Sequence, residues 1–288
     1  MEACLRGAHN GSLPLPPFLP PSASPFTMSF SLPALMTLLL SPVGLATIAI
    51  FTVAGCVKGI VGLGLPTVAM GLLALVMPPA QAAALLIIPA FLTNVWQALP
   101  WQSAWRVLRR LAGMQVGVCA GTWLAAWKWG APSGAGAAYL LGGALMAYGA
   151  WGLLARPLHL SRQAERWVGP LAGALTGAIA AITGVFVIPA VPYLQSLGLS
   201  RDELVQAMAI SFMISVAALA VVLARSADIS LGVAGASALL LLPALVGMAI
   251  GQRIRHALSP TVFRRCFLGS LILLGGYMVV AQAMKAGA

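Results

Sequence analysis

Apolar residues form long runs along this chain, separated by short charged or turn-rich joints. The runs cover residues 34–57, 60–77, 80–100, 106–127, 134–154, 168–197, 203–224, 231–251 and 262–284. A helix needs about 20 residues to cross the hydrocarbon core of a bilayer. The apolar region 34–77 is too long for one crossing, so we expect it to enter and return, turning between Lys58 and Pro66. The run 168–197 is ambiguous, because one tilted helix could also accommodate it.

The basic residues favour a hairpin in the ambiguous run as well. If both regions are hairpins, each followed by three spans, eleven basic residues fall on one side: Arg106, Arg109, Arg110, Arg156, Arg162, Arg166, Arg201, Arg253, Arg255, Arg264 and Arg265. The other side then carries only Arg6, Lys128, Arg225 and Lys285. A single crossing at 168–197 would nearly equalise the two sides. The positive-inside rule therefore predicts two hairpins, both termini outside, and cytoplasmic loops at 101–110, 156–166 and 252–265.

This arrangement predicts an all-α polytopic membrane protein with about 8–10 membrane segments. Each half, a broken-helix hairpin plus three transmembrane helices, has an odd number of net crossings, so the halves should have inverted topology. The predicted division is a disordered, proline-rich segment 1–33, a first transmembrane repeat 34–155, a basic linker 156–166 and a second repeat 167–286. The sequence from Met28 onward resembles an ordinary protein start, so residues 1–27 could come from an over-extended gene prediction.

Composition supports the membrane assignment. The chain is 60% hydrophobic and 7% charged with a mean hydropathy of +0.97, whereas soluble domains carry about 25% charged residues. The net charge of +11 does not indicate a nucleic-acid partner, because the basic residues cluster between apolar runs. The expected partner is the lipid bilayer.

The stretch GCVKGIVGLGLP, residues 55–66, places a lysine and four glycines inside an apolar region. A helix break there leaves backbone N–H groups that hydrocarbon cannot satisfy, so the break should face protein or a water-filled cavity. A half-helix starting after Gly64, with Pro66 in its first turn, would direct its positive end at that cavity. Together with Lys58, this predicts an anion site near the midplane of the membrane.

The second half contains a weaker version of this glycine-broken pattern, GALTGAIAAITGVFVIP (173–189). In it, Thr183, Gly184 and Pro189 would form a mirrored break. Each break is followed by a helix with a glutamine in its first turn, Gln81 in one half and Gln206 in the other. Paired interrupted helices in inverted halves are typical of transporter binding sites.

Each of these candidate site residues also has a purely structural interpretation. Lys58 could extend its ammonium to the interface, and the glycines of the first break could serve helix packing. Asn94, Gln97 and Gln206 could simply bond to neighbouring helices. Close helix contact is the preferred reading for glycines spaced four apart, which are Gly113, Gly117, Gly121, Gly169, Gly173 and Gly177.

The sequence contains no residue pattern that indicates an enzyme. The acidic residues (Glu2, Glu165, Asp202, Glu203, Asp228) and the histidines (His9, His159, His256) fall outside the interior of the predicted spans, with Glu203 at the first residue of one. There is no P-loop, GxSxG or HExxH pattern, and the cysteines lack metal-binding spacing. We expect no catalysis, no cofactor and no metal.

The blocks GCVKGIVGLGLPTVAMGLLALVMPPAQAAALLIIPAFLTNVWQAL and ITGVFVIPAVPYLQSLGLSRDELVQAMAISF resemble the TauE/SafE family of sulfite and organosulfonate exporters. The resemblance covers nearly all of 34–284. It implies a bacterial inner-membrane transporter with two related halves, whose cargo is a small sulfur-containing anion. The positions it implies for the site are Lys58, Gly59, Gly62, Gly64, Pro66, Asn94, Gln97, Thr183, Gly184, Pro189 and Gln206. The first break lacks a multiple-glycine run and the second lacks Gly-Gly-Pro, which leaves the substrate open.

Three hypotheses follow from the sequence: a transporter of sulfite-like or sulfonate-like anions by alternating access, a transporter of another small solute, or a non-transporting membrane scaffold. The direction of transport, the coupling ion and association into a homo-oligomer stay open.

Overall fold

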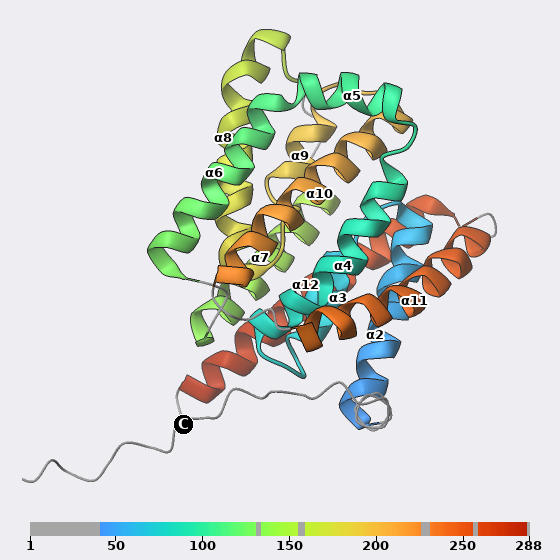
Figure 1. The fold of residues 1–288 in the computed structure, drawn as a ribbon, viewed down its shortest axis with the longest axis vertical. Coiled ribbons are helices and arrows are strands. Elements are labelled where there is room, and N and C mark those ends of the chain that lie inside the picture. The colour runs from blue at the N-terminus through green and yellow to red at the C-terminus, as the bar shows by residue number, and fades with distance from the viewer. Residues whose placement is uncertain (1–40, 131–133, 155–158, 226–230, 256–258, 287–288) are drawn as a thin grey trace, which may run out of the picture.

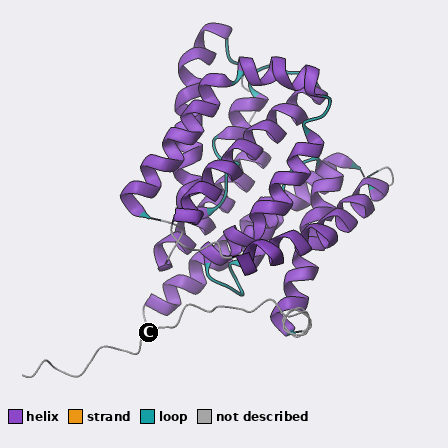
Figure 2. Cartoon of the chain, in the orientation of Figure 1, coloured by secondary structure: helices purple, strands orange, loops and turns teal. Residues whose placement is uncertain are grey.

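The described part of the chain is built from helices. The computed structural model describes residues 41–130, 134–154, 159–225, 231–255 and 259–286, and in these ranges every regular element is an α-helix (Figure 2). The helices are α2 (Pro42–Val61), α3 (Leu65–Leu73), α4 (Pro79–Gln97), α5 (Trp101–Arg110), α6 (Ala112–Trp129), α7 (Gly134–Leu154), α8 (Arg162–Thr183), α9 (Ala190–Gln195), α10 (Arg201–Arg225), α11 (Leu231–Ile254) and α12 (Pro260–Ala286). The proline-rich segment 1–33, including Met28, lies outside the described residues.

Six of these helices are long and apolar enough to cross a membrane, as the runs of the sequence predict. They are α2, α4, α7, α10, α11 and α12. Helices α6 and α8, with 18 and 22 residues, lie alongside each other in the same bundle (Figure 1). The all-helical, multi-span fold is therefore confirmed.

The first predicted break is present between α2 and α3. Gly62 and Gly64 have φ angles of 86° and 111°, a backbone conformation that L side chains avoid. Pro66 lies in the first turn of α3, where its missing N–H removes no helical hydrogen bond. The short helix α3 then leads back towards α4, so the region 34–77 does not cross as one helix.

The ambiguous run 168–197 also contains a break. Helix α8 ends at Thr183, Gly184 takes a φ of 70°, and the short helix α9 follows. The Thr183 hydroxyl donates to the carbonyl of Ile179 at 2.7 Å and accepts from the backbone N–H of Val185 at 3.1 Å. These bonds satisfy backbone groups that the end of the helix leaves free.

One predicted span was wrong in its start. The run 106–127 contains the end of α5 and most of α6, which are separate helices. In α5, Ala104 and Val107 are buried while Trp105 and Arg106 are exposed, and the helix lies across one end of the bundle (Figure 1). The charged face of α5 favours the membrane surface over the hydrocarbon core, so the apolar run divides at the joint between α5 and α6.

Glycines bring α6 and α8 into close contact, as their spacing predicts. A Cβ at Gly117 would overlap the carbonyl oxygen of Pro170, and one at Gly121 would overlap that of Ala174. In return, Gly173 and Gly177 face the carbonyl oxygens of Met114 and Val118. Since the contacting residues rise together in number, the two helices run in the same direction.

Glycines also bring α2 and α11 into close contact. Gly55 and Gly59 lie against the carbonyl oxygens of Ala244 and Met248. Gly247 and Gly251 lie against those of Thr52 and Cys56, so this pair is also parallel. In contrast, Gly142 approaches Gly275 and Gly149 approaches Leu268, which makes α7 and α12 antiparallel.

Helices α4 and α10 pack against each other in the middle of the fold (Figure 1). Pro89 interrupts the hydrogen bonding of α4, because it has no N–H. Ser237 of α11 compensates: its hydroxyl donates to the carbonyl of Leu85 at 2.8 Å and accepts from the N–H of Ile88 at 3.2 Å.

Candidate functional site

The first helix break carries a buried lysine. Lys58, in the last turn of α2, is 3% exposed. Its Nζ donates to Thr93 Oγ1 at 3.1 Å and to Asn94 Oδ1 at 2.5 Å, both on α4. Both contacts are with neutral oxygens, so neither partner balances a charge on this amine.

Hydrogen-bond donors outnumber acceptors around this ammonium. A lysine has three N–H donors, and two are used by Thr93 and Asn94. The Asn94 Nδ2 has no partner although the residue is 1% exposed, and the Thr67 hydroxyl of α3, also 1% exposed, is likewise unpaired. An unpaired buried polar group costs about 1–3 kcal/mol, and the Asn94 amide is such a donor directly beside Lys58.

The break between α2 and α3 forms the next part of the site. Gln97, at the end of α4, donates from Nε2 to the carbonyl of Gly62 at 2.5 Å. Helix α3 then begins at Leu65 without a side-chain cap from Gly64. Its first N–H groups carry the positive end of the helix dipole, adding to the charge of Lys58.

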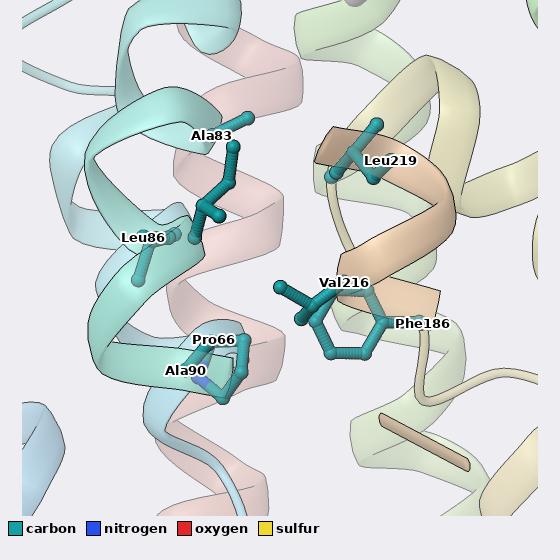
Figure 3. A pocket seen from close by; sticks show the side chains of 9 residues that line it. Pro66, Ala83, Leu86, Ala90, Phe186, Val216 and Leu219 are labelled. Carbon is teal, nitrogen blue, oxygen red and sulfur yellow. The ribbon is translucent and has the colours of Figure 1, made fainter. Parts of the chain in front are cut away.

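A small cavity lies where the two breaks approach each other (Figure 3). Pro66 of the first break and Gly184 of the second both line it, so these two predicted site residues come together. The other lining residues, from α4, α10 and the second break, are Ala83, Leu86, Ile87, Ala90, Phe186, Val216 and Leu219. In Figure 3, Phe186 and Val216 face Pro66 and Leu86 across the gap.

The polar cluster and the cavity occupy different levels of α4. Asn94 lies three residues before the end of α4, and Lys58 lies three residues before the end of α2, which is about 4.5 Å along each axis. Leu86 and Ala90 of the cavity lie nearer the middle of α4. The sequence predicted that Lys58 lies near the midplane, whereas the structure places it towards one end of its helix.

Four predicted site residues make structural contacts. Gly59 gives α11 its close approach to α2, and Thr183 closes the end of α8. The carbonyl of Pro189 accepts the N–H of Tyr193 at the start of α9. Gln206 donates from Nε2 to the carbonyl of Ala98 at 3.1 Å and to Ser103 Oγ at 2.8 Å, tying α10 to the α4–α5 joint.

Sequence reasoning missed Thr93, Thr67 and the cavity. Thr93 follows Pro89 by four residues and donates to its carbonyl at 2.6 Å, a spacing that marks it as a local bonding partner and not as a partner of Lys58. No sequence signal separates Phe186 from other buried aromatic residues. Among the residues that the structure describes, no group of three histidine, cysteine or carboxylate side chains could hold a metal ion.

Comparison with protein families gives one match over most of the chain. The model described as Sulfite exporter TauE/SafE matches residues 47–278. The chain belongs to the TauE/SafE family. The matched region contains both helix breaks, Lys58, and the α4 and α10 residues of the cavity. This membership suggests a membrane transporter of sulfur-containing anions, and it agrees with the resemblance seen in the sequence.

Comparison with curated proteins and with solved structures finds no match. The TauE/SafE assignment therefore rests on the family model, while the details of the site rest on the geometry described above.

Proposed function

We propose that this TauE/SafE protein carries small sulfur-containing anions, such as sulfite or organosulfonates, across the bacterial inner membrane. Lys58 is the central binding residue, with Asn94 and the start of α3 as further donors. The observation that carries the proposal is the buried amine of Lys58, which contacts only neutral oxygens and lies beside the unpaired Asn94 amide donor. The proposal includes no chemical conversion of the cargo.

The sign of the charge favours an anion over another small solute. Within the described ranges the sole ion pair joins Arg110 and Glu165, so Lys58 has no carboxylate to balance it. A metal cation would be repelled by the ammonium, and a neutral solute would leave the charge buried and unbalanced. A sulfite or sulfonate group offers three oxygen acceptors and a negative charge to this set of donors.

Alternating access is supported by the way the two halves correspond. The parallel pair α2–α11 in one part of the fold has a counterpart in α8–α6, and each pair contains one broken-hairpin helix and glycines on both partners. Gln206, near the start of α10, bonds beyond the end of α4, so these central helices run in opposite directions. This is the relation expected of inverted repeats, in which the substrate lies between paired breaks.

The basic segments also predict how the protein is oriented in the membrane. Loops 101–110, 156–166 and 252–265 carry basic residues and belong to the cytoplasmic side under the positive-inside rule. The Lys58 cluster, which is close to the α4–α5 joint, is then nearer the cytoplasmic surface.

Radiolabelled sulfite and methanesulfonate flux in proteoliposomes tests the function. The parent is compared with Lys58→Gln, and Lys128→Gln makes the same exchange at an exposed lysine. We expect saturable flux in the parent and in Lys128→Gln, with a loss of about tenfold or more in Lys58→Gln, since a hydrogen bond to a charged group contributes about 1.5–3 kcal/mol. Gel filtration and insertion yield establish that the variants are equally folded.

Two outcomes would count against the proposal. Unchanged flux in Lys58→Gln would make Lys58 a structural residue. The absence of saturable flux for either anion, with monodisperse and correctly inserted protein, would favour another cargo or a scaffold role.

A further inference from the structure

The apolar cavity lies one helical turn along α4 from Asn94, the partner of Lys58. Ala90 lines the cavity, and Asn94 lies four residues further along α4, so the two side chains are neighbours on one helix face. Ala83 and Leu86 extend the same face away from Asn94. On α3, Pro66 lines the cavity and the adjacent Thr67 bears the unpaired hydroxyl.

From this placement of polar donors and cavity on neighbouring turns we infer that the binding site is amphipathic and takes an organic monoanion with a short, uncharged hydrocarbon group. The acid group lies against Lys58, Asn94 and the start of α3, and the hydrocarbon group enters the cavity between Pro66 and Phe186. The inference rests on the proposed function and narrows its substrate class. Bare sulfite would leave the cavity unfilled.

The lining explains why a hydrocarbon group suits this space. Each of the nine lining residues has a non-polar side chain or is glycine, so a water molecule there would lack side-chain hydrogen-bond partners. The cavity has a volume of about 10 Å³, which admits about one water-sized group. The terminal methyl of an ethyl group matches that size, and longer chains require Phe186 or Leu219 to move.

The lining also disfavours a zwitterion. An ammonium at the far end of the substrate would enter a space without carboxylates or other polar side chains, at a considerable desolvation cost. Taurine and ethanesulfonate share a two-carbon sulfonate skeleton and differ by this ammonium. They are therefore a matched pair of probes for the polarity of the cavity.

Competition against radiolabelled methanesulfonate uptake, in proteoliposomes of the full chain, tests the inference. Unlabelled methanesulfonate, ethanesulfonate, propanesulfonate, taurine and sulfite are the competitors. We expect ethanesulfonate to compete roughly fourfold better than methanesulfonate, as burial of one methylene group predicts. Taurine should compete at least about tenfold worse than ethanesulfonate.

Substitutions of residues that line the cavity test whether the hydrocarbon group binds there. Leu219→Ala enlarges the cavity and should shift the preference towards propanesulfonate, whereas Leu92→Ala removes the same atoms from an exposed position on α4 and should keep the parental order. Ala90→Val reduces the space and should abolish the advantage of ethanesulfonate over methanesulfonate. The parental competition series needs no variant, so the test stands even if a variant fails to fold.

The outcomes separate this inference from the proposed function. Lys58-dependent uptake in which taurine and sulfite compete as well as ethanesulfonate would overturn the amphipathic site while keeping the anion transporter. The same parental order in Leu219→Ala and Ala90→Val would likewise place the hydrocarbon group elsewhere. A lack of saturable uptake for every sulfonate, with sulfite still carried, would overturn this inference alone, and a lack of uptake for sulfite as well would overturn both proposals.

Discussion

The Lys58 ammonium and the Asn94 carboxamide meet across the interface of α2 and α4, with Nζ donating to Oδ1 at 2.5 Å. Because Oδ1 faces the ammonium, the other end of the amide presents its Nδ2 as a donor, and this donor is buried without a partner. The pair therefore keeps an unused buried donor, Asn94 Nδ2, next to the Lys58 amine.

The first prediction concerns an isosteric change at Asn94. Asn94→Asp replaces the unpaired donor by a carboxylate that would form an ion pair with Lys58 and neutralise the site. We expect normal folding but anion flux reduced roughly ten- to hundredfold, because a charge-assisted hydrogen bond is lost and a repulsive charge is gained. Flux in proteoliposomes and thermal unfolding in detergent measure the two effects separately. Equal flux in the parent and in Asn94→Asp would mean that the anion binds elsewhere.

A second prediction concerns the conformation of the first break. Gly62 has a φ of 86°, and an added Cβ would meet Gln97 Nε2 only at an ordinary distance of 3.5 Å. Gly62→Ala should therefore lower the free energy of unfolding by about 1–2 kcal/mol through backbone strain alone.

Gly198→Ala is the matched control for that strain. Gly198 has a φ of 63° with open space around it and lies outside the proposed site. Both variants should be destabilised similarly in thermal unfolding, but only Gly62→Ala should reduce flux several-fold, because the Gly62 carbonyl holds Gln97. A similar flux loss in both would remove any special role for the first break.

A third prediction tests the close helix pairs. At Gly121 a Cβ would overlap the backbone of Ala174, whereas at Gly143, on an exposed face of α7, it would meet open space. Gly121→Ala should cost about 1–3 kcal/mol of stability, as overpacking does, and Gly143→Ala should be neutral or gain up to about 1 kcal/mol from helix propensity. Unfolding transitions in one detergent compare them, and equal transitions would show that the α6–α8 contact adds little.

Local sequence signals were enough for the breaks and for one helix pair. Gly62 and Gly64 interrupt an apolar run that is too long for one crossing, and glycines four residues apart indicate close helix contact. The split between α5 and α6 was missed because Val107 and Leu108 join the two apolar patterns, although Arg109 and Arg110 separate them.

The partners of Lys58 depend on tertiary structure. Thr93 and Asn94 lie 35 and 36 residues away along the chain, and only the return of α4 beside α2 brings them together. The cavity depends on four separate segments, whose Ala, Leu, Val and Phe side chains look in sequence like any others in a membrane bundle.

The last prediction concerns the ion pair of Arg110 and Glu165. Arg110 donates from Nε to Glu165 Oε2 at 3.0 Å and from one terminal nitrogen to the carbonyl of Leu197 at 3.0 Å. It therefore joins the end of α5 to the first turn of α8 and to the segment after α9. Since both partners are partly exposed, at 27% and 12% for their side chains, we expect Glu165→Gln to cost only about 1 kcal/mol.

The pH dependence of that cost has a definite sign. The hydrogen bond to Glu165 raises the pKa of Arg110, and burial opposes this rise. A raised pKa stabilises the fold at every pH below the usual arginine range and is lost only as the pH rises through the folded value. The Arg110 contribution should therefore be constant from neutral to mildly alkaline pH. A double-mutant cycle of Arg110→Gln and Glu165→Gln, measured by thermal unfolding at pH 7 and pH 9, should give the same coupling of about 1 kcal/mol at both. A coupling near zero would mean that the Leu197 carbonyl alone holds Arg110 in place.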